Sequence, residues 1–177
     1  MSVSYHASSR LLHWLMVLAL TANFILGISV HEMDLSPQKL QWLTWHKWAG
    51  MTLLGLVSVR LLNRLLFPPP PPEPAPAWQL LTGRLVHVLM YFLMFAIPLS
   101  GWMVSSAAGI PVVYLGMWEL PQLLPKNLAW LDALKEFHEW LNQALLTLVI
   151  IHVLAALKHH FIDRDHTLDR MLPKLKK

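Results

Sequence analysis

The chain has 177 residues, of which 55% are hydrophobic and 14% are charged. This composition excludes an ordinary soluble domain, and the length leaves room for only one domain, so we expect a single membrane domain over residues 1–177. The absence of cysteine excludes disulfides and every cofactor site built on thiolates, and nothing in the net charge of +4 calls for nucleic acid.

Four apolar runs follow one another along the chain, at about 11–30, 46–67, 84–105 and 138–160, and each approaches the roughly 20 residues that a helix needs to cross the hydrocarbon core. The first run lacks a small-residue cleavage site and contains His13 and Trp14, so we interpret it as a helix and not as a signal peptide. The sequence therefore predicts an all-α membrane protein, a four-transmembrane-helix bundle surrounded by the lipid bilayer.

If the chain crosses the membrane four times, lysine and arginine are distributed unevenly between the two sides of the membrane. The side that holds both termini and the middle loop has Arg10, Arg60, Arg64, Arg84, Lys158, Arg164, Arg170, Lys174, Lys176 and Lys177. The other side has only Lys39, Lys47, Lys126 and Lys135. Because loops rich in lysine and arginine stay in the cytoplasm, this bias predicts that both termini are cytoplasmic.

The connections between the runs are polar or rich in proline. The first has a turn or helix start at Ser36-Pro37, and the second, from Pro68 through Pro76, favours an extended polyproline spacer. Pro98 predicts a kink in the third run, beside a closely packed, irregular segment. For Ala107 to Glu136 we expect a lid in the membrane interface that ends in an amphipathic lead into the last helix.

Histidines inside the apolar runs are the strongest functional signal. His138 and His152 are fourteen residues apart in the last run, which corresponds to about 21 Å of helix rise and an angular offset of about 40°. Both imidazoles therefore leave one face of one helix at opposite membrane depths. Because a polar ring in hydrocarbon is costly unless it is buried against a partner or bound to something, this pair predicts a functional site.

Depth in the membrane sorts the possible partners of these two rings. Near the outer face, His46 is the only buried candidate opposite His138. Near the inner face, His152 can pair with His13 or with His87, and spacing alone does not choose between them. Zinc gathers three or four close ligands, whereas separated pairs of histidines suit two bis-histidine haems.

A glycine and several basic residues near these histidines could contact a haem, but each also has a structural explanation. Gly50 lies on the same helical face as His46, where it would let a flat macrocycle approach the backbone, but close helix packing explains it equally well. Haem propionates need cationic partners at the membrane boundaries, and each candidate also serves as a topology anchor. These candidates are Arg10, Arg60, Arg64 and Arg84 on the inner side and Lys47 and Lys135 on the outer side.

The combined motifs resemble the bacterial cytochrome b561 family over nearly the whole chain. They are Arg10-x-x-His13-Trp14, His46-x-x-x-Gly50, Arg60 to Arg64, His87 before Pro98-x-x-Gly101, and His138 with His152. The four-helix cytochrome b subunits of formate dehydrogenases and nickel-iron hydrogenases look similar.

The resemblance implies a protein of the bacterial inner membrane with two haem b groups. His13 and His152 would ligate the iron of the inner haem, and His46 and His138 that of the outer one. Arg10, Gly50, Arg60 and Arg64 would belong to the haem sites, and His87 would lie unligated beside the inner haem.

For stand-alone members of the family, the resemblance implies a superoxide:quinone oxidoreductase that oxidises periplasmic superoxide to dioxygen and reduces ubiquinone. A quinone carbonyl needs a proton donor near the inner haem, and His87 and His159 are candidates, the latter about 20° from the face of His152. The outer loops hold more acidic than basic residues, which leaves local patches around Lys47 and Lys135 to attract the anion.

Two other classes of function stay open on the sequence. One is a cytochrome b membrane anchor that passes electrons between a dehydrogenase or hydrogenase partner and quinone without an activity of its own. The other is a haem-free membrane protein, such as a transporter or assembly factor, whose histidines make polar contacts between helices.

Overall fold

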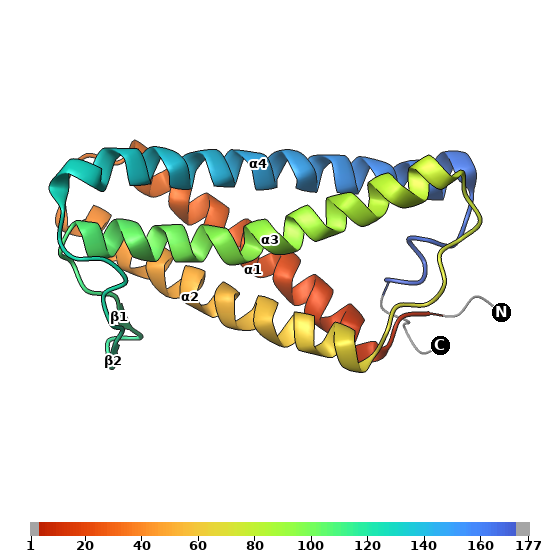
Figure 1. The fold of residues 1–177 in the computed structure, drawn as a ribbon, viewed down its shortest axis with the longest axis horizontal. Helices are drawn as coiled ribbons and strands as arrows, with labels where there is room; N and C mark the ends of the chain where they lie inside the picture. Colours follow the sequence, from red (N-terminus) through yellow and green to blue (C-terminus); the bar gives the residue numbers. More distant parts are fainter. Residues whose placement is uncertain (1–3, 173–177) are drawn as a thin grey trace.

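The computed structural model describes residues 4–172, and four long helices account for most of them (Figure 1). They are α1 (Ala7–Glu32), α2 (Pro37–Leu66), α3 (Ala77–Ala107) and α4 (Leu131–Lys158). The smaller elements are strands β1 (Val113–Tyr114) and β2 (Trp118–Glu119), the 3-10 turn η1 (Leu128–Trp130) and the π-helical turn η2 (His159–Asp163). Each long helix contains a stretch long and apolar enough to cross a membrane, so the protein is an all-α bundle with four spans.

Local sequence sets where the helices begin. Ser36 accepts a hydrogen bond from the Lys39 amide at 3.2 Å, and Pro37 occupies the first helical position, where its missing N–H costs nothing. Of the turn or helix start that the sequence left open at Ser36-Pro37, the structure has the helix start. At α1, the ring of His6 accepts from the amide of Ser8 at 3.4 Å and takes the place of the usual serine or aspartate cap.

All four long helices begin earlier than the sequence predicted, whereas α2 and α4 end close to their predicted ends, at Leu66 and Lys158. The second helix begins at Pro37 and not near residue 46, the third at Ala77 and not near 84, and the fourth at Leu131 and not near 138. Hydropathy marks the part of a helix inside hydrocarbon, whereas the backbone hydrogen bonds continue into the polar boundary. The third helix also continues through Pro98, so the irregular segment expected there is helical.

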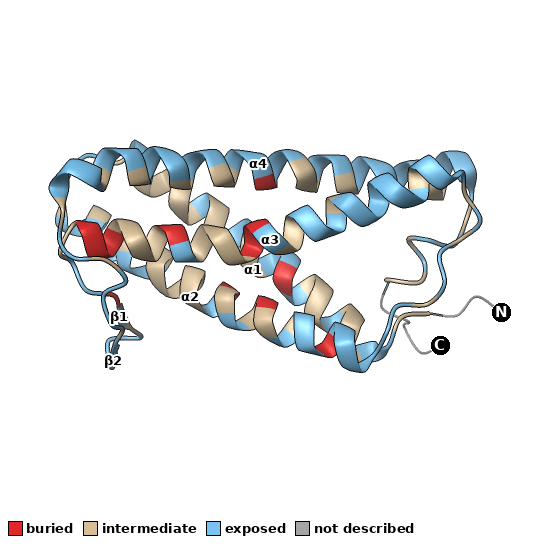
Figure 2. Ribbon diagram, viewed as in Figure 1, coloured by how far each residue is buried: buried red, intermediate tan, exposed pale blue. Residues whose placement is uncertain are grey.

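A small core joins the four helices at the middle of the bundle. Its buried members come from every helix and are Met16, Leu53, Val57, Leu93, Met94 and Leu145. Many other apolar residues are exposed, as the pale blue parts of the ribbon in Figure 2 show, and Leu18, Leu66 and Leu154 are more than half exposed. An outer surface of this kind suits contact with lipid tails, which fits the four spans.

A β-hairpin forms one end of the molecule, which we call the hairpin end (Figure 1). Strands β1 and β2 pair antiparallel through a turn in which Leu115 and Gly116 both have positive φ. The Trp48 indole donates to the carbonyl of Val113 at 2.7 Å, and the hydroxyls of Thr52 and Tyr114 lie 2.9 Å apart, so the hairpin is attached to α2. The segment 107–136 contains this hairpin, and the lead that was expected into the last helix is the start of α4. Its place in the membrane interface stays a prediction.

The opposite end, which we call the tail end, brings together residues 4–6, the proline-rich linker 67–76 and a C-terminal segment, residues 164–172, which we call the tail (Figure 1). The linker has no helix or strand, as its composition predicted. The Arg170 guanidinium donates to the carbonyl of Pro71 at 2.7 Å and forms an ion pair with Glu73, while the Tyr5 amide donates to the carbonyl of Arg170 at 3.3 Å. The tail therefore links both the start of the chain and the linker at this end.

Candidate functional site

Two pairs of histidine rings face each other inside the bundle. His46 of α2 faces His138 of α4 toward the hairpin end, with ring centroids 6.4 Å apart and ring planes at 83°. Nearer the tail end, His13 of α1 faces His152 of α4 with centroids 6.3 Å apart and planes at 70°. All four residues are half-buried, and α4 supplies one ring to each pair.

These separations fit a metal ion held between two imidazoles. A ligating ring nitrogen lies about 2 Å from its metal, and adding the half-width of each ring places two rings on opposite sides of one ion about 6 Å apart, centre to centre. Each pair offers only two ligands, from opposite sides. A haem iron needs two such ligands from the protein, whereas a tetrahedral zinc site would still lack two of its four.

The hydrogen bonds of His138 leave its other nitrogen free to bind a metal. The Ser100 hydroxyl donates its single hydrogen to the carbonyl of Ile97 at 2.8 Å and lies 2.8 Å from Nδ1 of His138. Ser100 must therefore accept a hydrogen bond from Nδ1–H, which leaves Nε2 with its lone pair. Across the pair, the buried Nδ1 of His46 has no hydrogen-bond partner within residues 4–172, so this ring has a polar atom that the protein alone does not satisfy.

Two glycines make room for the rings of this pair. A Cβ added to Gly27 of α1 would lie 3.1 Å from Cε1 of His46, and one added to Gly101 of α3 would lie 3.1 Å from Cε1 of His138. Gly101 was part of a predicted motif, but its relation to His138 was missed, and no sequence signal pointed to Gly27. A Cβ at Gly50 would meet only the side-chain nitrogen of Asn23, at 3.9 Å, so the role of Gly50 at a haem stays a prediction.

Arg60 and Arg64 lie beside the pair nearer the tail end. Arg60 donates to Nδ1 of His13 at 3.0 Å and to the Tyr91 hydroxyl at 3.1 Å, and the guanidinium carbon of Arg64 lies 5.9 Å from the centre of the Tyr91 ring. A guanidinium only donates, so His13 accepts at Nδ1 and carries its proton on Nε2. Binding a metal through Nε2 requires this bond to break, which would free Arg60 for an anion such as a propionate.

His87 also approaches His152, and its distance separates the two pairings that the sequence left open. The ring centroids of His87 and His152 are 5.2 Å apart, about 1 Å shorter than the spacing that a shared metal ion requires. His87 is also more exposed than His13. The geometry favours His13 as the partner of His152 and leaves His87 beside the pair.

Arg10 lies against the tail and not against a histidine pair. It donates to the carbonyl of Leu172 at 3.0 Å, and the neighbouring Trp14 indole donates to the carbonyl of Met171 at 3.0 Å. The Nε atom of Arg10 is buried without a partner in the described part of the chain.

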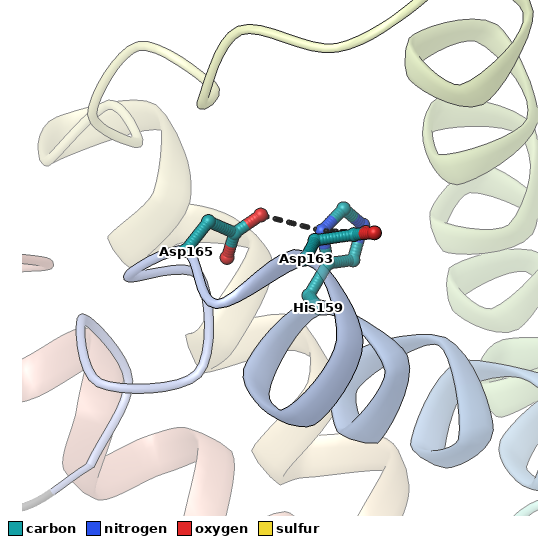
Figure 3. Close-up of side chains that lie close together, drawn as sticks. All are labelled: His159, Asp163 and Asp165. Atoms are coloured by element: carbon teal, nitrogen blue, oxygen red, sulfur yellow. Dashed lines mark hydrogen bonds and ion pairs between the residues drawn. The ribbon is translucent and has the colours of Figure 1, made fainter.

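His159 lies in η2 at the end of α4, seven residues beyond His152. Its Nδ1 is 2.6 Å from a carboxylate oxygen of Asp165 and 3.3 Å from one of Asp163 (Figure 3). Three such groups are close enough to share a cation, but the Lys158 ammonium already lies 2.6 Å from Asp163. Hydrogen bonds within the protein thus account for the cluster.

Comparison with known proteins agrees with this geometry. The family model described as prokaryotic cytochrome b561 matches residues 4–174. The chain is 36% identical to cytochrome b561 homolog 2 of Escherichia coli (strain K12), over 96% of this chain and 92% of the relative. It is 30% identical to the probable superoxide oxidase CybB of Yersinia pestis, over 92% of each chain, and 34% identical to cytochrome b561 homolog 1 of E. coli, over 74% of each.

The family model matches nearly the whole chain, the helices provide four spans, and the paired histidines have the spacing that haem ligation needs. The chain is therefore a multi-pass bacterial membrane protein that binds haem b and transfers electrons, and it belongs to the prokaryotic cytochrome b561 family.

Proposed function

We propose that the protein is a superoxide:ubiquinone oxidoreductase of the bacterial inner membrane with two haem b groups. Superoxide is oxidised to dioxygen at the hairpin end, which faces the periplasm, and ubiquinone is reduced in the membrane near the tail end, which faces the cytoplasm. The proposal depends on one observation: two pairs of facing imidazole rings, each with one ring from α4. The ring centroids are 6.4 Å apart in one pair and 6.3 Å apart in the other.

The chain's own residues would hold the two haems by the contacts described above. His46 and His138 would ligate the iron of one haem, and His13 and His152 that of the other. Ser100 would fix the tautomer of His138, and Arg60 and Arg64 would meet propionates. A bound haem b supplies one-electron redox chemistry, whose potential depends on axial ligands, hydrogen bonds and burial.

Lys47 is the residue best placed to attract superoxide. It follows the ligand candidate His46 directly, is half-buried, and makes no ion pair with a carboxylate of residues 4–172. Lys135, the other candidate of the sequence, is 3.2 Å from Asp132, so its charge is partly neutralised. A cation beside an electron-transfer group raises the local concentration of an anionic substrate.

The quinone end rests on His87 and His159. His87 lies beside His152, and His159 lies in η2, directly after α4 at the tail end. An imidazole can pass a proton to a quinone oxygen near neutral pH, as quinone reduction requires. The Yersinia relative is named a probable superoxide oxidase, which supports superoxide as the donor.

A cytochrome b anchor for a dehydrogenase or hydrogenase is the second candidate function. The same histidine pairs would serve it, and its electron donor would be a partner subunit. The two functions differ in whether the isolated chain reacts with superoxide.

Stopped-flow mixing of the purified, oxidised protein with superoxide, in the presence of a short-chain ubiquinone, tests the proposal. We expect rapid reduction of the b-type absorption followed by quinol formation, at a rate that falls as salt is added. Lys47→Gln should slow the reduction several-fold, whereas Lys39→Gln, whose lysine donates to the Met33 carbonyl, should leave it unchanged. Reduction no faster than in His138→Ala, or copurification with a large subunit and no reaction with superoxide, would favour the anchor.

A further inference from the structure

The chain reverses direction after α4 and brings a second carboxylate back onto His159. Turn η2 ends at Arg164, which has φ 54° and ψ 35°, in the left-handed region that reverses a helix end. The Asp165 amide then donates to the carbonyl of His159 at 3.1 Å. This turn holds the Asp165 carboxylate 2.6 Å from Nδ1 of His159 (Figure 3).

The carboxylate of Asp165 is itself held in place. Its second oxygen, Oδ1, accepts a hydrogen bond from the Thr167 amide at 2.8 Å. Partial burial acts to raise the pKa of Asp165, but hydrogen bonds from the backbone and side chain of Thr167 and from His159 outweigh it, so the pKa lies below its usual value. Asp165 is therefore an ionised acceptor with a fixed orientation.

Other charged groups near His159 have partners of their own. Asp163 lies 3.3 Å from Nδ1, but its nearest oxygen is 2.6 Å from the Lys158 ammonium. In the tail, Asp169 lies 3.9 Å from the ring of His160 and 3.4 Å from that of His166. Asp165 is thus the carboxylate that sets the state of the His159 ring.

We propose that Asp165 is a positioning residue that directs Nε2 of His159 toward proton transfer to the quinone, an inference that rests on the quinone reduction proposed above. An ionised carboxylate only accepts, so Nδ1 of His159 must carry a hydrogen and donate it. Nε2 then has the free lone pair and is the nitrogen that takes up and releases a proton. The side chains of His159 and Asp165 are 26% and 21% exposed, so water at the tail end reaches the pair.

The reaction balances with this single relay. One ubiquinone gains two electrons and two protons to become ubiquinol, and the electrons come from two superoxide ions oxidised to dioxygen. Each proton binds Nε2 of His159 from water at the tail end and then forms an O–H bond on the quinone. The imidazole returns to its neutral form each time, and the Asp165 carboxylate stays ionised throughout.

The test compares Asp165→Asn with Asp163→Asn, which removes the neighbouring carboxylate and is the matched control. The purified holoprotein is reduced chemically, so the experiment does not depend on superoxide, and is mixed with a short-chain ubiquinone in a stopped-flow instrument. The loss of the reduced b-type absorption gives the rate of electron transfer to the quinone. We expect D165N to slow this rate by about a hundredfold, with D163N close to the wild type.

A purely structural role for Asp165 would give a different set of results. Under the proposal, the difference in rate between D165N and the wild type becomes smaller toward acidic pH, because protons are then more abundant at the tail end. The haem spectrum and the quinone KM stay unchanged. Asp165→Glu keeps a carboxylate and recovers most of the rate. A D165N variant as fast as D163N, or a D165E variant as slow as D165N, would overturn the inference. A wild-type protein that quinone does not reoxidise would instead contradict the proposed function.

Discussion

The environment of His138 shows how single residues fix the state of one imidazole. Ser100 directs the tautomer through Nδ1, and Gly101, the next residue on α3, leaves space for the ring beside Cε1. Ser100 is 2% exposed, so its hydroxyl is removed from water and its two hydrogen bonds are satisfied within the protein. Neighbouring residues of α3 therefore fix both the chemical state and the position of this imidazole.

Replacing Gly101 by valine should reduce haem binding at the hairpin end. The added Cβ would lie 3.1 Å from Cε1 of His138, and the two methyl groups beyond it would push the ring out of line with His46. We expect G101V to lose one b-type haem of two, measured as haem per polypeptide by pyridine haemochrome analysis. Gly83→Val, made on the same helix where no atom lies within 4 Å of an added Cβ, should keep the full content. Equal haem content in the two variants would contradict this role of Gly101.

Among the elements, α4 has the central part because it contributes a ring to both histidine pairs. The periodicity of a helix was enough to predict this from the sequence, since His138 and His152 return to one face after fourteen residues. The tail had no comparable signal. Its main contacts join Arg170 to Glu73 and Trp14 to Met171, residues far apart in the chain whose pairing no local pattern encodes.

Loss of the ion pair between Arg170 and Glu73 should loosen the tail without unfolding the bundle. The side chains are 14% and 20% exposed, so the pair is screened by water less than an ordinary surface pair. We expect Arg170→Gln to speed hydrogen exchange in the tail and in residues 4–6, measured by mass spectrometry, with helices α1–α4 unchanged. Arg84→Gln, which replaces an exposed arginine near the start of α3, is the control.

The pair can be isolated by a double substitution. If the ion pair carries the effect, adding Glu73→Gln to Arg170→Gln should accelerate exchange no further, because the second residue has already lost its partner. Additive effects would show that Arg170 acts mainly through its bond to the Pro71 carbonyl.

For the whole molecule, apolar content and histidine spacing were sufficient to predict the architecture and two histidine pairs that share the last helix. The four spans are confirmed, because crossing hydrocarbon leaves the backbone few alternatives to a helix. The hairpin within 107–136 was not predicted, because it depends on long-range hydrogen bonds from Trp48 and Thr52 to Val113 and Tyr114. Gly27 was missed, because a glycine in an apolar helix looks the same in sequence whether it faces lipid or a ring.

Orientation in the membrane is a property of the whole chain. Basic residues gather at the tail end, where Arg60, Arg64, Arg84 and Lys158 lie near the ends of helices, and the negative inner surface of the membrane favours each by about 1 kcal/mol. We therefore expect the tail end in the cytoplasm. Green fluorescent protein fused after the last residue should fluoresce, and alkaline phosphatase at the same point should be inactive.

An insertion at the hairpin end is the matched control for this orientation. Alkaline phosphatase placed between Gly116 and Met117, in the exposed turn of the hairpin, should be active because that end faces the periplasm. The two phosphatase fusions must give opposite results if α4 crosses the membrane, because this one span lies between the hairpin and the C-terminal segment. An active C-terminal phosphatase fusion would show that the orientation is the opposite of the one expected. The Lys47 side of the protein, with any reaction with superoxide, would then lie in the cytoplasm.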